Sequence, residues 1–381
     1  MIAIDWARLI ATEFPSADAY ASPTQHARFD LYTRVLADTG AWSARHGLES
    51  LWPSPTLSFH AYLDASSYHA ACRTLDPRHH VHAAVLSRYI MWLSAVDVLF
   101  DDILLSRLTA SGWSPEQQEA YLHAVLWEIA APLRERYDGS TAQISRLLGV
   151  RPPGDVRTTE DDRRQLRRLV GCLEDLLRGL PSQTTDSGRQ LLVTELANAL
   201  GAQRGELEFA LAFGRTGTVP DLDSYLASSW NYIRTLLAPS FAVVPGIDEA
   251  GSFTAWLPAA TACGRAARIA NDNGTFIREQ EEGKPSSMTI TLASLGYPVD
   301  VRYTRDSPAF RHALQVQREL LDREITAFLH TLDETRPLTS PPVQQNHFML
   351  VVSGFYLAAY EHGDFDLGTD RDADATEGLV S

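Results

Sequence analysis

Segments with the apolar spacing of an α-helix follow one another along almost the whole chain of 381 residues. Prolines and glycines separate them, as in Gly283-Lys284-Pro285, where Gly stands just past a helix and Pro beyond it. No linker rich in Pro, Gly and Ser divides the chain, and a chain of this length can bury one large core. The sequence therefore predicts a single all-α domain, although length alone suggests two or three domains. The expected helices span about residues 26–46, 58–75, 81–108, 115–137, 139–149, 160–180, 190–213, 221–244, 261–283, 289–295, 307–332 and 343–362.

The two ends of the chain lack this helical pattern. Residues 1–25 contain Pro15 and Pro23 and are expected to form an irregular N-terminal strap. Residues 363–381 are rich in Asp and Gly and hold few large apolar side chains, so we expect an acidic, disordered tail there. The domain itself is predicted to span residues 26–362.

Composition argues against several classes of function. A net charge of −15 and a pI near 5.2 disfavour nucleic-acid binding. No signal peptide is expected, and no uninterrupted apolar run reaches the roughly 18–20 residues of a membrane span. The three cysteines, Cys72, Cys172 and Cys263, show neither a disulfide framework nor the spacing of a metal site. We therefore expect reduced core cysteines in a cytoplasmic protein.

A stripe of oxygen donors lies in the expected helix 261–283. At about 100° per residue, Thr275 falls about 40° and Glu279 about 80° from Asn271, so an amide, a hydroxyl and a carboxylate stack one turn apart. An all-oxygen ligand set suits a hard divalent cation such as Mg²⁺. Arg278 and Arg268 fall on the same face, which could therefore also hold a metal-bound anion, most obviously a diphosphate. The alternative interpretation of such a pattern is a solvated helix face.

A second acidic group stands far upstream. Asp97 and Asp101 are one turn apart on a helix whose preceding residues, 89–93, are almost all apolar, whereas Asp102 lies about 140° round from Asp97. Two aligned carboxylates in an apolar helix need a partner, because burying an unpaired charge is costly. A cluster of metal ions would supply it, and two such stripes on separate helices could clamp a diphosphate from both sides.

These two motifs resemble those of the class I terpene synthases. The second motif of that family, (N/D)DxxSxxxE, is matched by Asn271, Thr275 and Glu279, with Thr in place of Ser and Arg278 just before the Glu. The resemblance rests on the two short motifs and on the helical pattern across roughly residues 25–362. It implies an antiparallel helix bundle around a central active-site cavity.

The first motif of the family, DDxxD or a relaxed form of it, has two registers in this chain. If Asp97 is its first aspartate, Val98 replaces the second and Asp101 is the third. If Asp101 and Asp102 form the pair instead, Leu105 replaces the last aspartate. The first register is preferred because it keeps two carboxylates on one helix face.

Two further family features are missing. A diphosphate-sensing Arg is expected some 46 residues before the second motif, but residues 225–231 contain no Arg, and Arg234 is the nearest basic substitute. The Arg-Tyr pair that the family has near its C-terminus is replaced by Tyr360-Glu361-His362. These departures leave open a helical isoprenoid-binding protein without catalysis.

The resemblance implies an enzyme, a carbon–oxygen lyase that ionises an allylic isoprenoid diphosphate with three Mg²⁺ ions. The metal ligands would be Asp97, Asp101, Asn271, Thr275 and Glu279. Substrate contacts would come from Arg278, Arg234, Lys284, Tyr360, Phe348, Phe355 and Trp230. The expected partner is the substrate, and a homodimer is compatible with the family.

Substrate size and reaction class leave alternatives open. The residues around Gly274-Thr275 and the segment from Tyr360 to Asp364 resemble those of bacterial diterpene synthases. This resemblance favours a C20 substrate, either geranylgeranyl diphosphate or a bicyclic labdane-type diphosphate. A sesquiterpene synthase acting on farnesyl diphosphate is the alternative. A prenyl diphosphate synthase would carry a second Asp-rich motif, and a protonating class II cyclase would need DxDD, which the sequence lacks.

Overall fold

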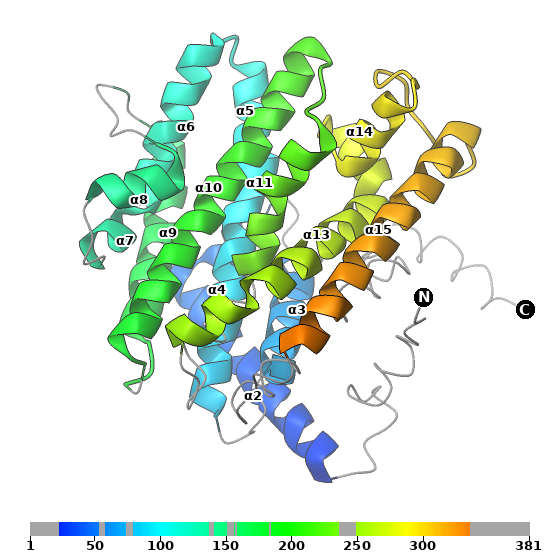
Figure 1. Ribbon diagram of the computed structural model, residues 1–381. Helices are drawn as coiled ribbons and strands as arrows, with labels where there is room; N and C mark the ends of the chain where they lie inside the picture. Colours follow the sequence, from blue (N-terminus) through cyan, green and yellow to red (C-terminus); the bar gives the residue numbers. More distant parts are fainter. Residues whose placement is uncertain are drawn as a thin grey trace, which may run out of the picture.

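The computed structural model describes residues 23–52, 58–73, 79–136, 141–150, 156, 158–182, 184–235 and 249–335. Within these residues every regular element is a helix, and each expected helix that falls among them is present (Figure 1). The helices are α2 (Pro23–His46), η1 (Leu48–Leu51), α3 (Ser58–Arg73), α4 (His80–Val98), η2 (Leu99–Leu104), α5 (Leu105–Ala110), α6 (Pro115–Ile129), α7 (Ala131–Arg136), α8 (Thr141–Leu148), α9 (Glu160–Arg178), α10 (Asp186–Thr216), α11 (Leu222–Thr235), α13 (Glu249–Glu282), α14 (Ser287–Ser294) and α15 (Pro308–Thr335).

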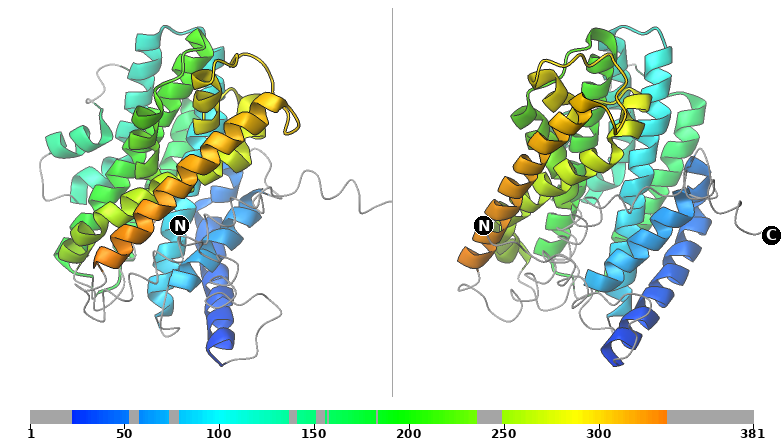
Figure 2. Two further views of the ribbon diagram at one scale, coloured as in Figure 1. Left: turned by 45° about the vertical axis from the view of Figure 1, so that its right-hand side comes forward. Right: turned by 90° about the vertical axis from the view of Figure 1, so that its right-hand side faces the viewer.

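The long helices pack as a bundle in which α10 and α13 are neighbours. α10 contacts α11, α8 and α13, while α13 lies against α15, α11 and α14. At the other side, α2, α3 and α4 pack on one another. In the right-hand view of Figure 2, α15 and α2 lie on opposite sides of the molecule, with α4 and α5 between them.

Helix α4 is the core of the bundle because it is apolar on nearly all sides. Met91 and Trp92 are fully buried, and Trp92 Nε1 donates a hydrogen bond of 2.9 Å to the Leu169 carbonyl oxygen of α9. One helical stretch of the described residues, His80–Ala110, is long and apolar enough to cross a membrane, but 83% of its apolar 18-residue window is buried inside the protein. Such burial is typical of a core helix.

Two predicted helix boundaries were wrong. The helix expected over 115–137 is broken at Ala130, because Pro132 cannot supply an N–H and its ring collides with the preceding turn. The helix expected from about Thr261 begins at Glu249 and includes Pro258 in its interior. An interior proline removes one backbone hydrogen bond without ending a long helix that is packed on its neighbours.

The end of α13 follows the prediction. Gly283 has a φ of 72°, the left-handed conformation that glycine adopts without strain. The Lys284 N–H donates to the Glu279 carbonyl oxygen at 2.9 Å, which closes the helix in a Schellman-type cap. The cap fixes the chain direction beyond the helix and places Lys284 beside the second oxygen-donor stripe.

Candidate active site

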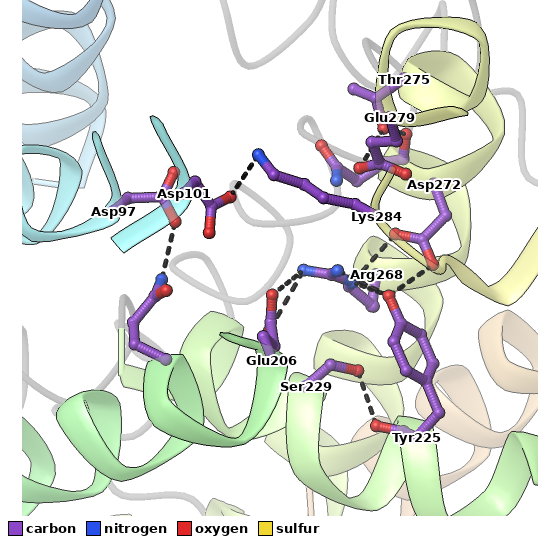
Figure 3. A network of polar contacts seen from close by, with 12 residues as sticks. Asp97, Asp101, Glu206, Tyr225, Ser229, Arg268, Asp272, Thr275, Glu279 and Lys284 are labelled. Atoms are coloured by element: carbon purple, nitrogen blue, oxygen red, sulfur yellow. Dashed lines mark hydrogen bonds and ion pairs between the residues drawn. The ribbon is translucent and has the colours of Figure 1, made fainter. Parts of the chain in front are cut away.

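The aspartate stripe lies where α4 passes into η2. Asp97 Oδ1 accepts a hydrogen bond of 2.7 Å from Gln203 Nε2 of α10, and Asp101 Oδ2 lies 3.0 Å from Lys284 Nζ. Figure 3 shows both carboxylates turned into the same space, with Lys284 extending toward Asp101 from the end of α13. The structure thus brings Lys284, which stands 183 residues away in sequence, to the first motif.

Asp101 lies in a π-helical turn, which the sequence analysis did not predict. Residues Leu99–Leu104 form this wider turn, so the angles of a regular α-helix do not apply there. Asp102 lies on the same turn and its side chain is exposed. Turns of this kind are rare in proteins overall, and those that occur often lie at functional sites.

The second stripe lies on the last turns of α13. Thr275 Oγ1 lies 2.8 Å from Glu279 Oε1 and 2.8 Å from the Asn271 carbonyl oxygen, as the one-turn spacing predicts. Glu279 is 7% exposed, and among the described residues its Oε2 atom is buried without a hydrogen-bond partner. A buried carboxylate oxygen without a donor favours a cation.

The two basic residues near this stripe differ in position. Arg278 is 64% exposed and lies 3.5 Å from Glu282, its partner one turn on. Lys284 is 15% exposed and contacts Asp101 and Glu282 at 3.0 and 2.8 Å. Lys284 therefore lies between the two motifs, whereas Arg278 lies at the rim.

A buried network below the stripes joins α10, α11 and α13 (Figure 3). Arg268 Nη1 lies 3.0 Å from Glu206 Oε2, and Arg268 Nε lies 2.9 Å from Asp272 Oδ1. The Tyr225 hydroxyl accepts from Arg268 Nη2 at 2.6 Å and donates to Asp272 Oδ2 at 3.0 Å. Asp272 also accepts the Ser287 N–H at 2.7 Å, so the network fixes the residue next to Asn271 and the start of α14.

Sequence analysis missed most of this network. Tyr225 stands 46 residues before Asn271, where the resemblance predicts an Arg, and the structure places the Arg268 guanidinium at its hydroxyl. The available signals were the i, i+4 pair of Arg268 and Asp272 and the glutamate Glu206, which stands between Gly205 and Leu207 in the expected helix 190–213.

The carboxyl groups of the site repel one another in a poorly solvated space. Burial, and next the charge of Asp101, raise the pKa of Asp97 to about 7. Burial, and next the charge of Asp272, raise the pKa of Glu279 to about 7. Burial raises the pKa of Glu206 to about 8, although Arg268 opposes the shift. These raised pKa values show that the described cations do not balance the buried acids.

The donor set fits Mg²⁺. Asp97 and Asp101 on one side and Asn271, Thr275 and Glu279 on the other offer only oxygen, which is the ligand type that Mg²⁺ prefers. Glu279 Oε2, buried without a hydrogen-bond partner among the described residues, is an oxygen that a cation could bind. Within the described residues, no three Asp, Glu, His or Cys side chains converge into one metal-binding group. Each stripe is therefore a partial ligand set.

The remaining predicted site residues are placed only in part. Trp230 lies on α11 against Gly264 of α13, where an added Cβ would come within 3.3 Å of Trp230 Cε3. Arg234 belongs to α11, and its side chain lies outside the described part of the structure. Phe348, Phe355 and Tyr360 also lie outside the described residues.

Solved structures show which known fold this is. No protein-family model matches the sequence, and no curated protein matches it significantly. Linalool/nerolidol synthase from Streptomyces clavuligerus, bound to 2-fluorogeranyl diphosphate, is similar in structure, with a TM-score of 0.54, 15% sequence identity and coverage of 88% of this chain and 95% of the synthase. 2-Methylisoborneol synthase from Streptomyces coelicolor A3(2), bound to Mg²⁺ and 2-fluoroneryl diphosphate, has a TM-score of 0.55 and 16% sequence identity. The match covers 88% of this chain and 93% of that synthase. A cucumene synthase variant has a TM-score of 0.55 and 13% sequence identity, and the match covers 88% of this chain and 95% of the variant. The chain therefore has the all-α fold of these terpene synthases.

Replacing Arg268 by Met should destabilise the fold strongly, because it leaves Glu206 and Asp272 buried without their cation. Breaking a buried ion pair in this way costs about 3–5 kcal/mol. Arg265→Met, on the same helix, breaks more exposed pairs and should cost about 0–1 kcal/mol. Urea denaturation of both variants measures the difference. Equal losses would show that the network does not stabilise the fold.

The metal-free protein should lose stability as pH rises from 5 to 8. In the unfolded chain, Asp97, Glu279 and Glu206 release their protons near pH 4, whereas the folded chain keeps them to about pH 7–8. The folded state therefore binds more protons over this interval, and the free energy of unfolding falls as they are removed. Asp97→Asn should gain at least about 1.4 kcal/mol relative to wild type between pH 5 and 8. Thermal unfolding in EDTA checks this, with exposed Asp161→Asn as the control. A constant difference between wild type and Asp97→Asn would contradict it.

Proposed function

We propose that this chain is a Mg²⁺-dependent class I terpene synthase, which ionises an allylic isoprenoid diphosphate and guides the cation to a cyclic or rearranged terpene. The observation that carries the proposal is the contact between Asp101 of the first stripe and Lys284, which follows the end of the helix that carries the second stripe. The uncompensated acids on both sides support it, because they match a cluster of cations and an anionic leaving group. The shared fold with diphosphate-binding synthases adds to that support.

The two stripes would hold the ions from opposite helices. Asp97 and Asp101 would hold them on the side of α4 and η2, and Asn271, Thr275 and Glu279 on the side of α13. When bound, Mg²⁺ supplies Lewis-acid stabilisation of the negative charge on the diphosphate. Gln203 orients Asp97 through its hydrogen bond, and Thr275 orients Glu279 in the same way.

The basic residues would stabilise the leaving group. In the ionisation step, the bond between C1 and the diphosphate oxygen breaks and its electron pair leaves with the oxygen, so negative charge grows on the diphosphate. Arg278 and Lys284 stand beside the second stripe and can donate hydrogen bonds to that charge, and Arg234 is a further candidate. The Arg268 network holds Asp272, and so the adjacent Asn271, in position.

The cation that remains must be shielded from water until it loses a proton or adds a nucleophile. Aromatic faces stabilise a cation without reacting with it. We propose Trp230, Phe348, Phe355 and Tyr360 as contacts of the isoprenoid chain.

For the substrate we propose a C20 diphosphate, geranylgeranyl or bicyclic labdane-type, on the resemblance of Gly274-Thr275 and of residues 360–364 to diterpene synthases. A second candidate is a sesquiterpene synthase acting on farnesyl diphosphate. One structural neighbour, a linalool/nerolidol synthase, supports this second candidate, because nerolidol is a C15 product.

The test is incubation of the purified protein with geranyl, farnesyl, geranylgeranyl and bicyclic labdane-type diphosphates, with Mg²⁺ or with EDTA. Terpene products are identified by gas chromatography–mass spectrometry, and the amount of released diphosphate is measured. We expect Mg²⁺-dependent release and a cyclic product from a C20 substrate. Binding of all substrates without release would favour the alternative, a catalytically impaired isoprenoid-binding protein.

Asp97→Asn should lower the rate of diphosphate release at least about a hundredfold, the order of loss expected when a charge-stabilising group is removed. Asp102→Asn should cost no more than about threefold, because its side chain is exposed and faces water. The inverse result, an inactive Asp102→Asn and an active Asp97→Asn, would show that Asp101 and Asp102 form the metal pair instead.

A further inference from the structure

Lys284 is fixed at its backbone, and its mostly buried side chain ends in ion pairs with Asp101 and Glu282. Its N–H closes the end of α13 on the Glu279 carbonyl oxygen at 2.9 Å, and buried Pro285 follows it. These anchors hold the base of the side chain beside the second stripe without using the ammonium group. The four-carbon stem can therefore change direction while the helix end stays intact.

The ammonium group of Lys284 occupies the first stripe. It lies 3.0 Å from Asp101 Oδ2, and among the described residues no other Lys or Arg forms an ion pair with Asp97 or Asp101. Burial alone would lower the pKa of Lys284, but the charges of Asp101 and Glu282 outweigh it and raise the pKa above its usual range. Lys284 thus remains a cation in this position.

A divalent cation and this ammonium group compete for the same carboxylate. Mg²⁺ binds carboxylate oxygen at about 2.0–2.1 Å, and a second cation 3.0 Å from the same oxygen would be strongly repelled. Mg²⁺ that takes Asp101 Oδ2 would displace Lys284 from that oxygen, and the anchored base of Lys284 keeps it within reach of an anion bound between the stripes.

We propose that Lys284 is a tethered counter-ion, which neutralises Asp101 before the metal binds and moves to the diphosphate once the metal takes Asp101. This inference rests on the proposed function and adds a role in coupling the two ligands. Lys284 opposes metal binding when no anion is present, and it strengthens anion binding after the metal has entered. Metal and diphosphate therefore bind with greater cooperativity than the ligand stripes alone would give.

The test is binding of Mn²⁺ alone, followed by inorganic diphosphate at saturating Mn²⁺, measured by electron paramagnetic resonance and calorimetry on the full chain. Lys284→Met should bind Mn²⁺ about tenfold more tightly than wild type, because a neighbouring cation is removed. The same variant should bind diphosphate about tenfold more weakly. Lys284→Arg keeps the charge and should stay within about threefold of wild type in both measurements.

The matched control is Arg265→Met, which removes the same charge from α13 outside the proposed site. Arg265 pairs with Asp223 and Glu324 and not with Asp101, so its loss should change the affinity for Mn²⁺ alone by no more than about threefold. Circular dichroism verifies that each variant is folded, and Lys284→Gln replaces Lys284→Met if the latter does not fold.

Three results would overturn the proposal. Lys284→Met that binds Mn²⁺ no more tightly than wild type, or no more tightly than Arg265→Met, would show that Lys284 does not compete with the metal. Tighter Mn²⁺ binding with unchanged diphosphate affinity would show that the ammonium does not move to the anion. If Asp97→Asn binds Mn²⁺ as tightly as wild type, the proposed function is overturned as well. This result separates failure of the proposed function from failure of the role of Lys284.

Discussion

The structure depends on how buried carboxylates are neutralised. Five acidic side chains lie in the region where α4, with η2, α10 and α13 approach one another. They are Asp97, Asp101, Glu206, Asp272 and Glu279. Arg268 compensates the lower pair from a buried position, and Lys284 compensates Asp101 from the helix end. The remaining charge is costly, as the raised pKa values of Asp97, Glu206 and Glu279 show. Binding of a cation to these carboxylates would stabilise the folded chain, because a ligand that binds only the folded state shifts the folding equilibrium.

The fold divides this task between a fixed and an adjustable part. Arg268, Tyr225 and Asp272 form a closed set of hydrogen bonds and ion pairs that holds α11 and α13 in register. Lys284 extends from a capped helix end and contacts Asp101 and Glu282 through the tip of a flexible side chain. The first group positions ligands, and the second can exchange one negatively charged partner for another. This division lets the carboxylates lie close together although their negative charges repel one another.

Much of the fold followed from the sequence, and less of the site did. Helical periodicity and the Pro and Gly breaks predicted the helices, and the end of α13 at Gly283 was predicted because a glycine past a helix has a definite local geometry. The one-turn contact of Thr275 with Glu279 followed from the helix period. The π-helical turn at Asp101 was not predictable, since it depends on packing around η2 and not on residue spacing. Contacts of Gln203, Glu206 and Lys284 with distant helices were missed for the same reason, because periodicity describes one helix at a time.

The central claim is that the two stripes together hold one metal–diphosphate cluster, and thermal unfolding with ligands tests it most directly. Wild type is melted with Mg²⁺, with inorganic diphosphate, and with both, beside Glu279→Gln, which removes the one anionic ligand of the second stripe. The account predicts that both ligands together raise the melting temperature by more than the sum of their separate effects, because each supplies the charge that the other lacks. Glu279→Gln should lose most of that excess. Additive shifts that Glu279→Gln leaves unchanged would show that this face of α13 does not bind the cluster.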